Sequence, residues 1–403
     1  MIQKLIGKYE IVKPDEKADI YIINTCSVTN MSDRKSRQMI RRAKELNPDA
    51  LVIAVGCYAE TAKEEIEAIP EVDLVLGNFQ KANIEKYIEA YFEGKVLDEK
   101  AVESYFYDFG TVTYTEKTRA VVKVQDGCNN FCSYCIIPYA RGRICSRKPE
   151  SVLEEIREIA KMGIKEVVIT GIQVASYGKD FDDDYGLIDL LEDINKIDGI
   201  ERIRLGSLEP LIITDEFCDR LGKIDKICHH FHLSLQSGCD KTLKEMNRRY
   251  TIAQFEEVVG RLRKLYEDVI LTTDIIVGFP NETDEDFEIT YQFLKNVKFY
   301  KTHVFKFSPR KGTVAAKMKN QVDGKKKEER SKRLIELSLE NQSEYLKNYI
   351  GKDVEVLFEE EEDGLLKGHT ANYIMVKSRQ DVCKLNEIIR VNVKKIGDEF
   401  LIA

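Results

Sequence analysis

Three cysteines lie close together in the middle of the chain, in the segment GCNNFCSYCIIPYARGR. Cys128, Cys132 and Cys135 have the spacing C-x3-C-x2-C. Three thiolates on one short loop can bind three irons of a cubane iron–sulfur cluster. The fourth iron is then left open, as a catalytic metal requires, and it could chelate the amino and carboxylate groups of a methionine moiety. The spacing therefore favours a catalytic iron–sulfur cluster.

Structural zinc is the alternative occupant of these thiols. Zinc prefers four ligands, usually in two spaced pairs, and Cys145 is the one further thiol or imidazole group nearby in the sequence. We interpret Cys145, in a basic turn, as a bystander. Four more cysteines are interpreted as scattered buried thiols, which is common for free cysteine: Cys218, Cys228, Cys239 and Cys383.

A second pair of cysteines follows two strand-like segments near the N-terminus. Cys26 ends the run INTC, and Cys57 ends LVIAVGC, about one βαβ unit later. Adjacent parallel strands joined by one helix place their carboxyl ends side by side, where open α/β sheets bind ligands. We therefore expect both thiols to face one crevice and to form a functional pair.

The elements that must position these cysteines fall into three regions. The first, at about 1–115, alternates helix and strand, which implies a parallel α/β sheet. A short helix is expected at Ile2–Ile6, and the remaining expected elements are strands at 18–23, 51–55 and 72–76 and helices at 34–46 and 61–68.

The middle region repeats the alternation more strictly. Six βα units fit an incomplete barrel of the (βα)8 type, in which chemistry takes place at the carboxyl ends of the strands. The three-cysteine segment follows the first of these strands directly. A capping box of Ser151 and Glu154 is expected to open one helix, and Gly163 to end it. The strands are expected at 120–125, 166–171, 201–206, 230–235, 271–279 and 301–308.

The last region changes character after one long helix, expected at 331–349. Segments 353–360, 367–378 and 387–403 alternate with a period near two around polar turns. Short strands of this kind predict a small closed β-barrel.

The composition and charge of the chain indicate how many domains it has and in which compartment it works. The chain has 403 residues, 43% hydrophobic residues and a net charge of −8, so several domains are expected and a nucleic-acid partner is not predicted by net charge. No run of 18 apolar residues and no signal-peptide pattern occurs, so we expect a cytoplasmic protein without a membrane contact. In that compartment the cysteines are not expected to form disulfides, and the clustered ones are candidates for metal binding or catalysis.

The surrounding sequence resembles the radical S-adenosylmethionine (SAM) methylthiotransferases. The cysteine spacing with Tyr134 as the aromatic residue is the superfamily signature, and the resemblance spans the middle region. It implies a methylthiotransferase domain at 1–115, an incomplete (βα)6 radical SAM barrel at 116–343 and a TRAM domain at 344–403. The matching segments are CSYCIIPYARGR, TGIQVASYG, RIRLGSLEP, HLSLQSG, MNRRY, DIIVGFPNET and FSPRKGT.

The resemblance implies that a [4Fe–4S] cluster on the three central cysteines cleaves SAM into methionine and a 5′-deoxyadenosyl radical. That radical would abstract hydrogen from an unreactive carbon. Gly171 and Gln173 would lie near the methionine end of SAM, and Glu209 and Gln236 would make ribose or similar polar contacts. Ordinary hydrogen bonding at strand ends is the alternative for these polar residues.

The resemblance also implies an auxiliary [4Fe–4S] cluster held by three cysteines of the N-terminal domain. Cys26 and Cys57 match the second and third, and the first has no match. We therefore expect one strand and its ligand to be missing ahead of the first helix, because the start is misassigned, the chain is truncated or another ligand is used. Apolar surface is then expected to be uncovered, and the auxiliary cluster to be labile.

The C-terminal segment GHTANYIMV resembles the TRAM domain, an RNA-binding β-barrel. Basic stretches at 33–44 and 310–333 could contact phosphates in spite of the net charge. A solvated helix face is the alternative for each stretch. His369 and Tyr373 could stack on bases or pack inside the barrel, and the sequence does not decide between these roles.

The segments FSPRKGT and RIRLGSLEP and the cluster loop favour the branch of the family that acts on threonylcarbamoyladenosine in tRNA, although Gln173 and Lys306 depart from its pattern. The expected reaction is methylthiolation at C2 of N6-threonylcarbamoyladenosine at position 37, with two SAM molecules, an external electron donor and a sulfur donor. Isopentenyladenosine in tRNA or an aspartate of a ribosomal protein are the alternative substrates. A SAM-cleaving enzyme that cannot insert sulfur and a non-catalytic RNA-binding protein are two further hypotheses.

Overall fold

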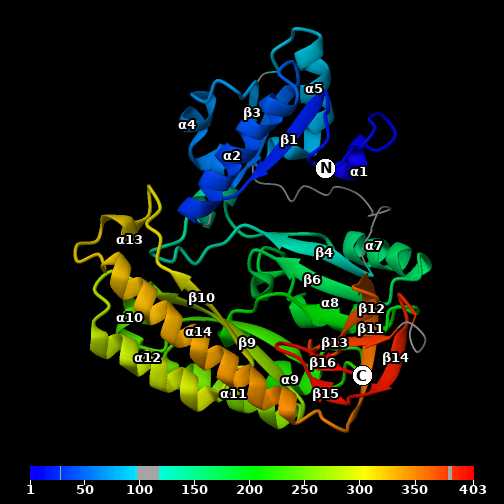
Figure 1. The fold of residues 1–403 in the computed structure, drawn as a ribbon, viewed down its shortest axis with the longest axis vertical. Coiled ribbons are helices and arrows are strands. Elements are labelled where there is room, and N and C mark those ends of the chain that lie inside the picture. Colours follow the sequence, from blue (N-terminus) through cyan, green and yellow to red (C-terminus); the bar gives the residue numbers. More distant parts are fainter. Residues whose placement is uncertain (28, 98–117, 380–383) are drawn as a thin grey trace. The chain divides into compact units, whose positions relative to one another are not determined.

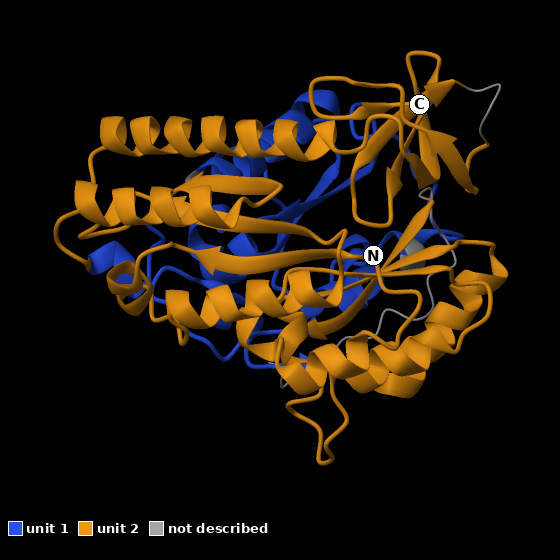
Figure 2. Cartoon of the chain, turned by 90° about the horizontal axis from the view of Figure 1, so that it is seen from below, with its two compact units in different colours: residues 1–114, 126–145, 308–317 blue, residues 115–125, 146–307, 318–403 orange. Residues whose placement is uncertain are grey.

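The structure is a computed structural model that describes residues 1–27, 29–97, 118–379 and 384–403. The chain forms two compact units, coloured separately in Figure 2. Unit 1 comprises 1–114, 126–145 and 308–317, and unit 2 comprises 115–125, 146–307 and 318–403. Each unit combines segments that are far apart in the sequence, whereas each predicted domain is one continuous range. The predicted domain limits therefore stay a prediction.

Unit 1 contains a parallel sheet in the order β1-β2-β3, as predicted. The central strand is fully buried, and its side chains alternate between two cores. Val52 and Ala54 pack with α2, whereas Leu51, Ile53 and Val55 pack with α1 and α5. The elements are α1 (Ile2–Leu5), β1 (Ile20–Thr25), α2 (Asn30–Leu46), β2 (Leu51–Gly56), α3 (Cys57–Thr61), α4 (Lys63–Glu67), β3 (Leu74–Leu76), η1 (Gln80–Asn83), α5 (Ile84–Phe92), α6 (Ile137–Arg141) and α13 (Val314–Lys317).

Two predictions about unit 1 need correction in detail. The helix expected at 61–68 is the shorter α4, and a further short helix that was not predicted, α3, precedes it across a bend at Ala62. The helix expected at 34–46 begins earlier, because the Thr29 side chain accepts a hydrogen bond from the backbone N–H of Ser32 and caps its start.

Unit 2 contains a curved sheet of six parallel strands, and this half-barrel confirms the predicted incomplete barrel. Ladders join β4, β6 and β7, and further ladders join β8, β9 and β10. Single bridges, such as the one between Leu208 and Leu233, connect the two groups. The strands are β4 (Arg119–Asp126), β6 (Glu166–Gly171), β7 (Arg202–Leu205), β8 (His230–Gln236), β9 (Ile270–Val277) and β10 (Lys301–Lys306), with the two-residue β5 (Cys145–Ser146) beside β4.

Helices cover the outer face of the half-barrel (Figure 1). They are α7 (Pro149–Lys161), η2 (Val174–Ser176), α8 (Leu187–Asn195), η3 (Pro210–Ile212), α9 (Asp215–Leu221), α10 (Asp240–Glu245), α11 (Ile252–Leu265), α12 (Asp284–Val297) and α14 (Gly324–Lys347).

The capping box expected at Ser151 is wrong. Helix α7 begins at Pro149, which suits a first helical position, and Ser151 lies inside the helix, where its hydroxyl accepts hydrogen bonds from Arg147. The expected end is confirmed, since Gly163 has a φ of +79° just after the helix. Helix α14 begins well before the predicted 331, because the Asp323 side chain caps it.

The C-terminal strands form a mainly antiparallel sheet in the order β14-β11-β12-β13-β16-β15. These strands lie at the amino ends of β4 and β6 (Figure 1). The hydrophobic core of the sheet also includes Tyr300, Ile270 of β9, and Leu346 of α14. The strands are β11 (Asp353–Glu362), β12 (Leu365–Thr370), β13 (Met375–Arg379), β14 (Ile388–Asn392), β15 (Lys395–Ile396) and β16 (Leu401–Ile402).

Candidate active site

The three-cysteine loop follows β4 and belongs to unit 1. Gly127 lets the chain turn sharply into it, with a φ of +66°, and a Cβ there would lie 1.8 Å from the Arg143 carbonyl oxygen. The Cys128 N–H donates to the Gly142 carbonyl at 3.1 Å, and the Cys135 N–H donates to the Cys132 carbonyl at 3.0 Å. These backbone hydrogen bonds therefore close the loop and hold the main chain at its first and last cysteines.

The FSPRKGT segment braces this loop from a distant part of the sequence. The Ala315 N–H, just beyond that segment, donates to the Ser133 carbonyl at 2.8 Å. Arg310 forms a largely buried ion pair with Asp33 of α2, at 2.7 Å. Sequence patterns do not reveal this bracing role, because the contacts join residues far apart in the chain.

The loop's donor set fits an iron–sulfur cluster in its chemistry. All three thiols and Tyr134 are half-buried, and the Asn130 N–H donates to the Cys128 sulfur at 3.4 Å. Among the described residues, no three His, Cys, Asp or Glu side chains are grouped as ligands of a single metal ion. Ligands of a cubane each bind a different iron, so they need not converge on one point.

Cys26 and Cys57 follow the carboxyl ends of neighbouring strands. Thr25 and Gly56 are paired in the β1–β2 register, so both cysteines leave the sheet at the same edge. The Thr25 hydroxyl donates to the Val55 carbonyl at 2.7 Å and accepts from the Ala59 N–H at 3.1 Å, which ties the two strand ends together. Cys26 is exposed, and Cys57 is buried at the start of α3.

The Cys57 site packs against the end of the three-cysteine loop within unit 1, through contacts between α3 and α6. Asn78 donates to the Cys57 sulfur at 3.5 Å and to the Ala140 carbonyl at 2.7 Å. Arg141 contacts Asp126 at 3.2 Å. Burial lowers the pKa of Arg141, but Cys57 and Asp126 beside it raise the pKa above its usual value overall.

Two predicted SAM contacts lie together at the carboxyl end of the half-barrel in unit 2. Gln125 and Gly171 are paired in the β4–β6 register. The buried Gln125 side chain accepts from the Gln173 N–H at 2.7 Å. A Cβ at Gly171 would lie 2.8 Å from the Gln125 carbonyl oxygen, so a side chain there would disturb this end of the sheet.

The remaining two predicted contacts are braced by the MNRRY segment. The Glu209 carboxylate accepts from Arg248 at 2.9 and 3.1 Å, and burial raises the pKa of Glu209 although Arg248 opposes that shift. The Tyr250 hydroxyl lies 2.7 Å from the Leu235 carbonyl, next to Gln236, which has a φ of +69°. The MNRRY motif is the signal in the sequence for these bracing residues, but it does not reveal their partners.

The segment that most resembles TRAM packs inside unit 2. Tyr373 stacks on His230 and on His369, with ring centroids 4.9 and 4.7 Å apart, and the Arg204 guanidinium lies 4.7 Å from the centroid of the Tyr373 ring. Arg204 also donates to Glu166 at 2.7 Å and to the Ala371 carbonyl. His369 and Tyr373 could stack on bases or pack within the protein, and these contacts support packing.

Three cysteines interpreted as buried thiols are buried, namely Cys218, Cys228 and Cys239. Cys383 lies outside the described residues. Cys145 is half-buried at the start of β5.

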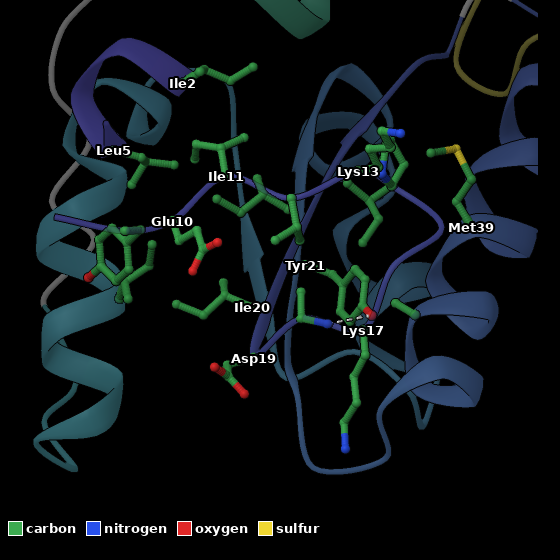
Figure 3. A pocket seen from close by; sticks show the side chains of 18 of the residues that line it. Ile2, Leu5, Glu10, Ile11, Lys13, Lys17, Asp19, Ile20, Tyr21 and Met39 are labelled. Atoms are coloured by element: carbon green, nitrogen blue, oxygen red, sulfur yellow. Dashed lines mark hydrogen bonds between the residues drawn. The ribbon is translucent and has the colours of Figure 1, made fainter. Parts of the chain in front are cut away.

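An apolar cavity of about 560 Å³ borders the outer edge of β1 in unit 1 (Figure 3). Its lining includes Leu5, Ile11, Ile20 and Met39, and the cysteines are not among its lining residues. The cavity is therefore separate from the cysteine site. None of the helices in the described ranges combines the length and apolar character needed to cross a membrane.

Family models match two parts of the chain. The model described as the Radical SAM superfamily matches residues 122–294, and the model described as uncharacterized protein family UPF0004 matches residues 1–77.

Curated relatives match nearly the whole chain. A threonylcarbamoyladenosine tRNA methylthiotransferase (MtaB) of Bacillus subtilis is 41% identical over 96% of this chain and 88% of its own. The corresponding Thermotoga maritima protein is 38% identical over 100% and 92%. A tRNA-2-methylthio-N(6)-dimethylallyladenosine synthase of a Thermoanaerobacter species is 38% identical over 100% and 84%.

Among solved structures, the radical SAM methyltransferase TsrM of Kitasatospora setae matches with a TM-score of 0.57 and 17% identity, over 75% of this chain and 66% of that chain. At this identity the match supports a shared fold.

Proposed function

This chain belongs to the radical SAM methylthiotransferase family, and we propose that it attaches a methylthio group to C2 of N6-threonylcarbamoyladenosine at position 37 of tRNA. The observation that carries the reaction type is the packing of α3, which begins at Cys57, against α6, which follows Cys135. One compact unit thus holds both sets of thiols. Such an arrangement suits a reaction that needs a radical and a sulfur atom together.

The residues have separate tasks in this proposal. Cys128, Cys132 and Cys135 would hold a [4Fe–4S] cluster, and Cys26 and Cys57 would hold the auxiliary cluster. When bound, the first cluster supplies the electron that cleaves SAM. Gly127 and the hydrogen bonds of the loop hold its thiols in place.

The carboxyl end of the half-barrel would bind SAM. Gln125 fixes the backbone of Gln173, and Gly171 allows β6 to lie close to Gln125, where any side chain would clash. Arg248 and Tyr250 hold Glu209 and the end of β8 in place. These contacts orient the polar groups without requiring them to move on binding.

Two basic surfaces are the candidate contacts for RNA. Arg34, Lys35, Arg41 and Arg42 lie on α2, and all four are exposed. On α14, Lys325 is exposed, whereas Arg330 is buried and paired with Glu282, so part of that basic stretch serves the fold. Phosphate contacts of this kind would make binding weaken with salt.

The choice of nucleoside rests on the relatives, since the MtaB proteins of Bacillus subtilis and Aquifex aeolicus are 41% identical to this chain and the Thermoanaerobacter dimethylallyladenosine enzyme is 38% identical. The test is to incubate the reconstituted chain with SAM, a reductant and tRNA that carries either unmethylthiolated nucleoside, and to analyse the digested RNA by mass spectrometry. We expect the methylthio product from threonylcarbamoyladenosine. Product from the isopentenyl nucleoside alone would overturn the substrate assignment, and 5′-deoxyadenosine without either product would favour a SAM-cleaving enzyme that cannot insert sulfur.

A further inference from the structure

The Cys57 thiol has two nitrogen-bearing side chains beside it that the proposed reaction does not yet use. Asn78 is held from both sides, because its backbone N–H donates to Glu60 at 2.8 Å and its side-chain amide donates to the Ala140 carbonyl at 2.7 Å. The same amide nitrogen lies 3.5 Å from the Cys57 sulfur. Asn78 is therefore fixed as a hydrogen-bond donor toward that sulfur.

Arg141 is the second neighbour, and it is the last residue of α6. Its Nη1 contacts both oxygens of Asp126, at 3.2 and 3.3 Å, and its side chain is 23% exposed. Asp126 directly precedes Gly127 and the three-cysteine loop. Asn78 bridges the Cys57 sulfur and the Ala140 carbonyl, and α3 packs on α6, so Arg141 follows directly on a backbone group that is held at Cys57.

Two polar atoms at this place are buried without a hydrogen-bond partner among the described residues. They are Nε of Arg141 and Oδ1 of Asn78. A buried N–H without an acceptor costs about 1–3 kcal/mol, so such groups are rare unless a ligand or water completes them. A sulfur-bearing anionic group at Cys57 would give the arginine Nε–H an acceptor.

We propose that Arg141 and Asn78 form the hydrogen-bonding shell of the iron–sulfur group held at Cys57, with Arg141 as the positioning residue that balances its negative charge. This inference rests on the proposed function, because it needs a cluster at Cys26 and Cys57. Hydrogen bonds and nearby charge set the reduction potential of an iron–sulfur cluster. Loss of a half-buried cation makes addition of an electron less favourable, and the potential becomes more negative.

The test uses the full chain with Cys128, Cys132 and Cys135 replaced by Ala, reconstituted anaerobically, so that the remaining cluster is the one at Cys57. Its potential is measured by a redox titration followed by electron paramagnetic resonance. We expect Arg141→Gln to shift the potential to more negative values, and Arg141→Lys, which keeps the charge, to shift it less. Arg157→Gln removes an arginine of α7 in unit 2 and is the matched control.

The outcomes separate the two claims. A cluster whose potential in Arg141→Gln equals that of the Arg157→Gln control overturns the inference and leaves the proposed function standing. If the triple-Ala chain assembles no cluster that depends on Cys26 and Cys57, both are overturned. Restoration of the potential by Arg141→Lys argues against a purely structural role, because a packing defect would not follow the charge.

Discussion

At the scale of single residues, the proposed chemistry depends on thiols that the sequence reveals and on hydrogen-bond and charge partners that it does not reveal. The spacing of Cys128, Cys132 and Cys135 predicts a cluster loop, because local spacing determines which thiols share a loop. Asn78 and Arg141 carry no comparable signal, since their contacts with Cys57 and Asp126 depend on how α3 packs on α6. Glu209 is a predicted ligand contact, but its ion pair with Arg248 does not follow from spacing.

Single replacements of the two kinds of cysteine should have different effects. Cys132→Ala removes a ligand of the loop and is expected to abolish formation of 5′-deoxyadenosine from SAM. Cys57→Ala is expected to spare that cleavage and to stop methylthiolation of tRNA. Both products can be quantified in one reaction by liquid chromatography and mass spectrometry. Continued SAM cleavage by Cys132→Ala would refute the assignment of the loop.

Arg248→Met should destabilise unit 2, because it leaves the half-buried Glu209 carboxylate without its cation. The loss should be smaller than the about 3–5 kcal/mol that breaking a fully buried ion pair costs. Chemical denaturation measures this loss, with Arg249→Met as the control, since Arg249 lies next to Arg248 and is less buried. Equal stability of the two variants would mean that the pair contributes little.

At the scale of elements, hydrophobic alternation predicts the strands well and the helix starts less well. Strands β6 and β2 fall within one residue of their predicted ends, because buried runs rich in β-branched residues mark them. Helix starts depend on single residues at the cap, and Pro149 and Asp323 determine two of them against prediction. Local patterns do not predict that the C-terminal sheet packs on the amino ends of the half-barrel strands. That packing depends on contacts between distant residues, such as the hydrogen bond from Arg202 to the His369 carbonyl.

That docking depends on Tyr373, whose ring contacts His230, His369 and two arginines. Tyr373→Ala is expected to lower the free energy of unfolding by about 3 kcal/mol, as for similar large-to-small changes of packed aromatic residues. Tyr91→Ala, at a position that is 41% exposed, is the control and should change stability by less than about 0.5 kcal/mol. Thermal or denaturant unfolding followed by circular dichroism gives both values. A loss of RNA binding without a loss of stability would instead assign Tyr373 to RNA contact.

At the scale of the whole molecule, the chain combines a parallel sheet unit that holds the candidate cluster cysteines with a half-barrel that carries the predicted SAM contacts and a C-terminal sheet. The C-terminal sheet packs on the amino ends of the half-barrel strands, so it does not cover the carboxyl ends, where the predicted SAM contacts lie. Periodicity in the sequence predicts these architectures, but it does not predict that residues 308–317 join the unit of the cysteines.

The stability of the whole chain should fall in mild acid through His230. Burial lowers the pKa of His230 well below its usual 6.5, and the positive charge of Arg204 lowers it further. Below pH 6.5 the unfolded chain therefore takes up a proton that the native chain excludes, and stability decreases as the pH falls, by up to about 1.4 kcal/mol per pH unit. His230→Phe keeps a ring against Tyr373 and removes this proton. Unfolding measured between pH 7 and pH 5 should then show a weaker pH dependence, and an unchanged dependence would exclude His230 as its source.

The most direct test of a two-cluster enzyme is the content of iron and acid-labile sulfide per chain after anaerobic reconstitution. The unaltered chain is compared with a Cys26→Ala/Cys57→Ala double variant and with a Cys128→Ala/Cys132→Ala/Cys135→Ala triple variant. Two cubane clusters predict about eight irons in the unaltered chain and about four in each variant. About four irons in the unaltered chain and in the double variant alike would contradict this, because the N-terminal cysteines would then hold no cluster and this chain would lack its sulfur site.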